Sequence, residues 1–201
     1  MVSTEFHSTS SGSRERLLES AWALFRHFGI KKVTVEDIAR EAGVSKMTFY
    51  KYFRNKKDIV LRIMDREMEQ GKEQFHRIMD DSVPFIEKVQ RLILAKEEAG
   101  KRFGEHFLKD IYSGDPSIYQ SMMQASQEFQ EEIIQAFQAE QARGAIRSDL
   151  RMEFLQYMMG RMQNMFLDPE LQKFYPDQLS LIRELVKFLF YGISSDGGAT
   201  H

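Results

Sequence analysis

The 201-residue sequence contains no cysteine. This absence excludes a disulfide framework, thiol catalysis and any zinc site built on cysteine. Prolines are few, and no Asn-Gly or Asp-Gly turn joins two alternating strand patterns, so β-hairpins have no signal. No apolar run approaches the length of a membrane span, and the polar start MVSTEFHSTSSG lacks the core of a secretory signal. We therefore expect an all-α, cytoplasmic protein.

Sequence patterns that are typical of catalysis are missing as well. The chain has no GxSxG, HExxH, GxGxxG or P-loop motif. His106 and Asp110 are four residues apart, a spacing that would place both on one helix face and on one metal or ligand. A surface or pocket-edge role is the alternative for this pair. We predict no enzymatic activity, no metal and no cofactor.

Charge is distributed unevenly along the chain. Residues 13–66 carry 13 Lys and Arg against 7 Asp and Glu, whereas residues 67–201 carry 15 against 22. A basic amino-terminal region is therefore joined to an acidic body, although the whole chain has a net charge of only −2. This asymmetry favours phosphate binding at the amino-terminal end.

Local signals divide the basic region into short helices. Residues 13–28 are predicted as a first helix that Gly29 ends. The apolar stripe of this helix is Leu17, Ala21, Leu24 and Phe28. Thr34 and Asp37 have capping-box spacing and start a second helix.

Gly43 ends the second helix and Ser45 caps a third, so the turn Gly43-Val44-Ser45 has the spacing of a helix-turn-helix. In the third helix Phe49 and Phe53 are i,i+4 neighbours and define the buried side. The outward and flanking positions are Met47, Thr48, Lys51, Tyr50 and Tyr52. This helix therefore presents a small, basic surface flanked by aromatic rings.

The rest of the chain is predicted to form longer helices. Asn55 with Asp58 starts a fourth helix that continues toward Ile78 without a break. Five further helices are predicted at residues 84–102, 105–112, 116–143, 151–166 and 177–192. The predicted domains are a disordered start (1–12), a helix-turn-helix domain (13–55), a helical ligand-binding and dimerisation domain (56–193) and a disordered tail (194–201).

Two stretches of the sequence match a known pattern. Residues 14–62 contain an opening helix that ends AWALFRHFGI, followed by KKVTVEDIAREAGVSKMTFYKYFRNKKDIV, and residues 144–150 read GAIRSDL. In this order and spacing they resemble the tetracycline-repressor (TetR) family of bacterial transcriptional regulators. The resemblance implies a homodimer that binds a palindromic DNA operator and releases it when a small molecule enters the larger domain.

The resemblance also implies which residues contact DNA. The family's recognition helix corresponds to residues 46–53, and two phosphate contacts lie at the starts of the second and fourth helices. The implied set is Thr34, Lys46, Met47, Thr48, Tyr50, Lys51, Tyr52 and Lys56. The family more often has an aromatic residue at position 51 and histidine at 52, so Lys51 can contact guanine or a phosphate. Met47 can meet a thymine methyl or cover the helix start.

Methionine and phenylalanine are concentrated in the acidic body. One stripe consists of Leu155, Met158, Met159, Met162, Met165 and Phe166, and another of Leu179, Ile182, Val186, Leu189 and Ile193. We predict that the two stripes form a dimeric four-helix interface. Met-rich surroundings also suit an apolar or aromatic ligand. The candidate ligand-binding residues are Phe103, His106, Phe107, Met122, Met123, Phe129, Met158 and Met162.

Three functions compete on these observations. The first is a ligand-responsive, DNA-binding regulator, a repressor by family resemblance. The second is a helix-turn-helix module that binds protein, and the third is a small all-α enzyme or carrier that uses the Met- and Phe-rich region alone. Specific, strongly salt-dependent DNA binding would select the first. Turnover of a small molecule without DNA binding would select the third.

Overall fold

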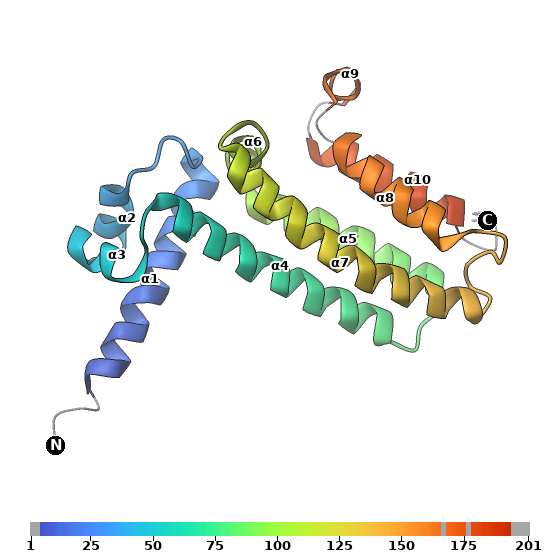
Figure 1. Ribbon diagram of the computed structural model, residues 1–201, viewed down its shortest axis with the longest axis horizontal. Coiled ribbons are helices and arrows are strands. Elements are labelled where there is room, and N and C mark those ends of the chain that lie inside the picture. The colour runs from blue at the N-terminus through green and yellow to red at the C-terminus, as the bar shows by residue number, and fades with distance from the viewer. Residues whose placement is uncertain (1–4, 166–167, 176–177, 194–201) are drawn as a thin grey trace. The chain divides into compact units, whose positions relative to one another are not determined.

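The computed structural model describes residues 5–165, 168–175 and 178–193, and the elements that it defines there are all helices (Figure 1). They are α1 (Glu5–Phe28), α2 (Val35–Glu41), α3 (Lys46–Tyr52), α4 (Lys56–Asp80), α5 (Phe85–Phe103), α6 (Glu105–Ser113), α7 (Pro116–Ala142), α8 (Met152–Met165), α9 (Pro169–Gln172) and α10 (Gln178–Ile193). The all-α prediction is confirmed. None of the helices described is both long and apolar enough to cross a bilayer.

The helix boundaries agree closely with the sequence patterns, with two differences. α1 begins at Glu5 rather than at Ser13, because the polar residues before Ser13 include no proline that would stop a helix. α9 was not predicted from the sequence. Asp168 caps this single turn by accepting a hydrogen bond from the Glu170 backbone N–H at 2.8 Å. The predicted tail 194–201 lies outside the described residues.

The chain divides into two compact units. The head unit contains the chain up to Glu69 together with Arg102–Met123, and the body unit contains Gln70–Lys101 and the chain from Gln124 onward. The head unit is therefore larger than the predicted domain 13–55, because α6 and the start of α7 fold with the helix-turn-helix.

A continuous apolar core holds the head unit together. Leu17, Ala21 and Phe25 of α1 are fully buried against Phe49 of α3 and Ile59 of α4. The prediction that Phe28 belongs to the α1 core stripe is wrong, since this side chain is 48% exposed. Phe28 is the last residue of α1, so its side chain lies at the end of the buried face rather than within it.

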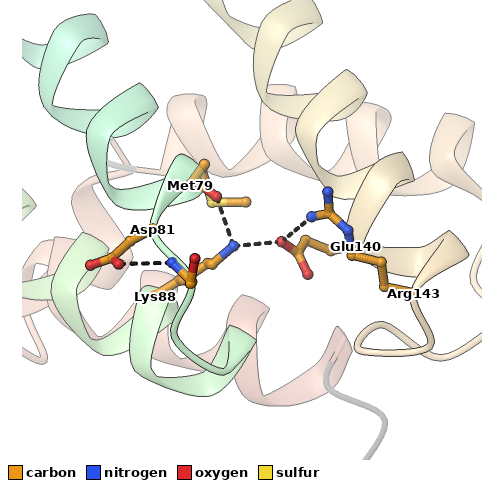
Figure 2. Close-up of polar contacts among 6 residues, drawn as sticks. Met79, Asp81, Lys88, Glu140 and Arg143 are labelled. Atoms are coloured by element: carbon orange, nitrogen blue, oxygen red, sulfur yellow. Dashed lines mark hydrogen bonds and ion pairs between the residues drawn. The ribbon is translucent and has the colours of Figure 1, made fainter.

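The body unit has a second core, formed by the end of α4, α5, α7, α8 and α10. Phe85 and Phe137 meet edge to face in it, with ring centroids 5.9 Å apart. Beside them the buried Lys88 donates to the Met79 carbonyl at 2.7 Å and to Glu140 Oε1 at 2.8 Å (Figure 2). Arg143 donates to the same carboxylate oxygen at 3.0 Å. Four groups from three helices and a following turn are thereby joined in one polar cluster.

Several members of the two predicted dimer stripes are core within the chain, so the structure corrects the predicted interface at those positions. Leu155 and Ile193 are buried in the body core, and Val186 packs against it. Phe166 and the side chain of Leu179 lie outside the described residues. Periodicity identifies a buried face but does not say whether the same chain or a partner covers it. The exposed apolar side chains of α8 and α10 are instead Phe154, Tyr157, Phe188 and Tyr191.

Candidate nucleic-acid interface

The recognition helix α3 is oriented as its sequence predicts. Phe49 and Phe53 are buried, at 0% and 2% exposed, and fix the inward side. On the opposite side Met47 is 82% exposed, and on the flank Tyr50 is 50% exposed, with its ring edge to face with Phe49 at 5.5 Å. Tyr52 is half-buried against the head core. Since burial of the two phenylalanines sets the rotation of the helix, the outward residues are held in fixed directions.

Side-chain caps set where α2 and α3 begin. The Thr34 hydroxyl accepts from the Asp37 backbone N–H at 3.1 Å, and Asp37 accepts from the Thr34 backbone N–H at 3.0 Å. Ser45 accepts from the Thr48 backbone N–H at 3.0 Å at the start of α3. Both caps were predicted, because capping depends on residues only three apart. Thr34 therefore has a structural role besides its predicted phosphate contact.

The turn between the two helices depends on one glycine. Gly43 has φ +64°, a left-handed conformation that residues with a Cβ adopt only at a cost. The Val44 backbone N–H then donates to the Ala39 carbonyl at 2.9 Å and closes the end of α2. Gly43 thus sets the direction in which the chain enters α3.

The two lysines of α3 have different surroundings. Lys46 forms an ion pair with Glu36 of α2. The hydrogen bond with Glu36 raises the pKa of Lys46, and the same bond lowers the pKa of Glu36. The Lys51 ammonium instead lies 5.7 Å from the centre of the Tyr52 ring. Glu36 was not identified from the sequence, because it is ten residues from Lys46 and on another helix.

Lys56, the predicted phosphate contact of α4, is engaged within the protein. Its ammonium donates to the Ile30 carbonyl at 2.7 Å and to the Val33 carbonyl at 2.8 Å. Desolvation by the surrounding protein lowers the pKa of Lys56. The side chain therefore fastens the start of α4 to the loop between α1 and α2. A phosphate contact at this position would use the backbone N–H groups of the helix start.

Helix α6 supports the same loop from another direction. Asp110 accepts a hydrogen bond from the Lys31 backbone N–H at 2.8 Å, and its side chain is 14% exposed. His106 is exposed and forms no metal cluster with Asp110 among the described residues. His106 and Asp110 both lie on α6, but the Asp110 carboxylate is already bound to the Lys31 backbone N–H.

The predicted ligand-binding residues are divided between the two units. Phe103, His106, Phe107, Met122 and Met123 belong to the head unit, and Phe129, Met158 and Met162 to the body unit. In the head unit the Phe103 and Phe107 rings stack at 5.8 Å, and Trp22 meets the Phe107 ring edge to face at 5.1 Å. These aromatic residues of the predicted set serve as packing around the end of α1.

Phe129 and two methionines of the set lie in the body unit and are buried or half-buried. In the body unit Phe129 meets Phe75 edge to face at 5.3 Å. Met162 is buried and Met158 half-buried. An open groove does lie on the outer side of α8, between Leu150, Phe154 and Tyr157, but none of the predicted ligand-binding residues lines it.

Comparisons with known proteins identify the family of the helix-turn-helix region. Residues 17–63, which contain α2, α3 and the first turns of α4, match the model of the bacterial regulatory proteins, tetR family. The chain is 33% identical over 82 residues to the uncharacterized HTH-type transcriptional regulator YhgD of Bacillus subtilis, a match that covers 41% of this chain and 43% of YhgD. This chain thus matches less than half of the length of YhgD.

Two further proteins extend the likeness beyond the helix-turn-helix. The HTH-type transcriptional regulator SAR2658 of Staphylococcus aureus is 30% identical, and the match covers 53% of this chain and 71% of SAR2658. The transcriptional regulator FadR from Bacillus subtilis, solved in complex with stearoyl-CoA, has the same fold, with a TM-score of 0.63, 18% identity, and coverage of 89% of this chain and 98% of FadR. The chain belongs to the tetR family of bacterial regulatory proteins.

Proposed function

We propose that this protein is a cytoplasmic, ligand-responsive transcriptional regulator, a repressor that binds a palindromic DNA operator and leaves it when a small apolar or aromatic molecule binds. The observation that carries the proposal is the outward face of α3. Met47 and Tyr50 are large side chains that the fold leaves in solvent, next to Lys51. Exposed rings and methionines beside a cation suit contact with base edges and thymine methyl groups.

The fixed geometry around α3 supports this role. Caps at Thr34 and Ser45 and the left-handed Gly43 set the start of each helix and the turn between them. Lys56 and Asp110 hold the loop before α2 from two sides. A reading helix that is positioned in advance does not have to be ordered when DNA binds.

A homodimer is part of the proposal, with a different surface from the predicted one. Phe154 and Tyr157 on α8, and Phe188 and Tyr191 on α10, are two i,i+3 pairs of exposed large side chains. Their exposed fractions run from 40% to 74%. Contiguous exposed apolar residues mark interaction surfaces. Two copies of the chain would present two α3 helices to two inverted half-sites about one helical turn, or a multiple of it, apart.

An acyl chain is the first ligand class to test. The FadR structure that shares this fold was solved with stearoyl-CoA. The long acyl chain of that molecule is apolar, as the proposed effector is. Helix α4 contributes residues to both units, so a ligand that prefers one arrangement of α4 would change operator affinity. A typical coupling of about 1–3 kcal/mol lowers affinity roughly 5- to 150-fold, and the operator weakens ligand binding by the same factor.

The proposal is tested by selecting a library of random duplexes with the purified protein and sequencing what is retained. We expect an inverted repeat, with binding that weakens steeply as salt rises. A library that is not enriched would favour a protein-binding helix-turn-helix module. Stearoyl-CoA and aromatic compounds are then screened for thermal stabilisation, and each hit is titrated with and without the selected operator. A hit with equal dissociation constants in both titrations is not an inducer.

A further inference from the structure

One acidic side chain lies against the face that we propose to contact DNA. Glu36, in the first turn of α2, pairs with Lys46 at the start of α3. Their side chains are 56% and 52% exposed. Lys51, on the same helix as Lys46, forms no ion pair among the described residues and is exposed. Two cations of one short helix are thus unequal: one is neutralised by an acid and one is not.

The side-chain caps of both helix starts come from residues other than Glu36. The start of α2 is capped by Thr34 with Asp37, and the start of α3 by Ser45. Glu36 is exposed rather than packed in the head core. On a phosphate-binding surface an acid beside a lysine has a clear effect, because each neutralised phosphate adds to affinity through counterion release. Glu36 cancels one such contribution.

We propose that Glu36 is a specificity-determining residue that suppresses binding to random DNA by keeping Lys46 paired. This inference rests on the DNA-binding function proposed above. On a duplex that places no base acceptor opposite Lys46, the ammonium stays with Glu36 and displaces no counterion. On an operator that places a guanine acceptor there, Lys46 changes partner, because exposed ion pairs contribute little to stability and exchange easily.

The substitution Glu36→Gln frees Lys46 at nearly constant side-chain shape. On a random duplex we expect the plot of log affinity against log salt to steepen by about 0.9, the value for one added phosphate contact, with up to about eightfold tighter binding at 0.1 M salt. Operator affinity should rise less, because Lys46 already contacts the operator in the unmodified protein. The ratio of operator to random affinity should therefore fall.

Matched variants separate this mechanism from a general change of charge. Glu41→Gln removes the same charge from the far end of α2, where Glu41 is exposed and forms no ion pair among the residues that the structure describes. Lys51→Gln in the unmodified background should reduce the random-DNA salt slope by about 0.9, because Lys51 has no acid to neutralise it among the described residues. In the Lys46→Gln background, Glu36→Gln should no longer steepen the slope.

The measurement is fluorescence anisotropy of a labelled random duplex from about 50 to 200 mM salt, with circular dichroism to show that each variant is folded. A steeper slope for Glu36→Gln alone supports the inference. A slope change no larger than that of Glu41→Gln, or the same steepening in the Lys46→Gln background, overturns it. If the unmodified protein binds no duplex, the proposed function fails. If it binds duplexes and Glu36→Gln changes nothing, only the role of Glu36 is refuted.

Discussion

The carboxylate of Asp110 in α6 lies 2.8 Å from the Lys31 backbone nitrogen, a contact between residues 79 positions apart in the sequence. It leaves no room for a side chain at Gly29, where an added Cβ would lie 2.6 Å from Asp110 Oδ2. Gly29 also has φ +85°, a left-handed conformation. The loop that leads into the helix-turn-helix is therefore fixed by α6 as well as by its own chain.

We predict that Gly29→Ala destabilises the head unit more than Gly43→Ala does. Both glycines are left-handed, and a Cβ there costs about 1–2 kcal/mol. An added Cβ at Gly43 would meet nothing within 4 Å, whereas at Gly29 it would displace Asp110. The difference should be at least about 1 kcal/mol, the usual loss for a hydrogen bond. Urea unfolding followed by the fluorescence of Trp22 measures it, and equal losses would count against the Asp110 contact.

The buried pair of Lys88 and Glu140 makes a second prediction. Their side chains are 5% and 6% exposed, so Lys88→Met leaves a buried carboxylate with Arg143 as its remaining partner (Figure 2). We expect a loss of roughly 3–5 kcal/mol in unfolding free energy for the single variant. The double variant Lys88→Met with Glu140→Met should recover most of that loss. A double variant as unstable as the single one would show that the charges themselves are needed.

Acid should weaken the start of α2 through Asp37. Hydrogen bonds from Thr34, and then from Arg40, lower the pKa of Asp37 below its ordinary value of 3.8. A lowered carboxyl pKa adds stability that is complete above the ordinary value and is lost as the pH falls through the lowered value. The melting temperature of the unmodified protein should therefore fall more steeply on acidification below pH 3.8 than that of Asp37→Asn. Parallel curves would mean that this carboxylate does not stabilise the fold.

The proposed dimer surface can be separated from the core by two substitutions on α10. Phe188 is 74% exposed, so Phe188→Glu should give a folded protein that sediments as a monomer. Ile182 is only 9% exposed, so Ile182→Lys buries an unpaired charge and should unfold the body unit. Analytical ultracentrifugation with circular dichroism distinguishes the two results. A Phe188→Glu protein that remains a stable dimer contradicts a contribution of this side chain to the interface.

Local features of the fold could be predicted from the sequence. The caps at Thr34 and Ser45, and the inward side of α3, depend on residues three or four apart, where helix geometry fixes the relationship. The stretch around Asn55 and Asp58 also starts a helix as expected, with Asn55 accepting from the Asp58 backbone N–H at 2.9 Å.

Features that depend on how helices cross could not be predicted. The pairs Glu36–Lys46 and Asp110–Lys31 join different helices and loops, and no spacing rule connects them. The stripe with Leu155 was identified as apolar and assigned to a second chain, but Leu155 itself is buried in the core of its own chain. Composition also placed Phe107 among the ligand-binding candidates, which stays a prediction, but it did not indicate that the Phe107 ring packs against Trp22 in the head core. These contacts depend on how the helices pack in three dimensions, which the spacing of residues along the sequence does not determine.

The central claim is that the outward face of α3 reads DNA sequence, and the variant Met47→Ala with Tyr50→Ala tests it most directly. Both side chains are exposed and uncharged, so their removal should leave the fold and the salt-dependent attraction to phosphates intact. Anisotropy titrations with the selected operator and with a random duplex give the two affinities. We predict a loss of about 1–3 kcal/mol on the operator for each base contact removed, with little change on the random duplex. Equal losses on both duplexes, or no loss on the operator, would contradict the claim.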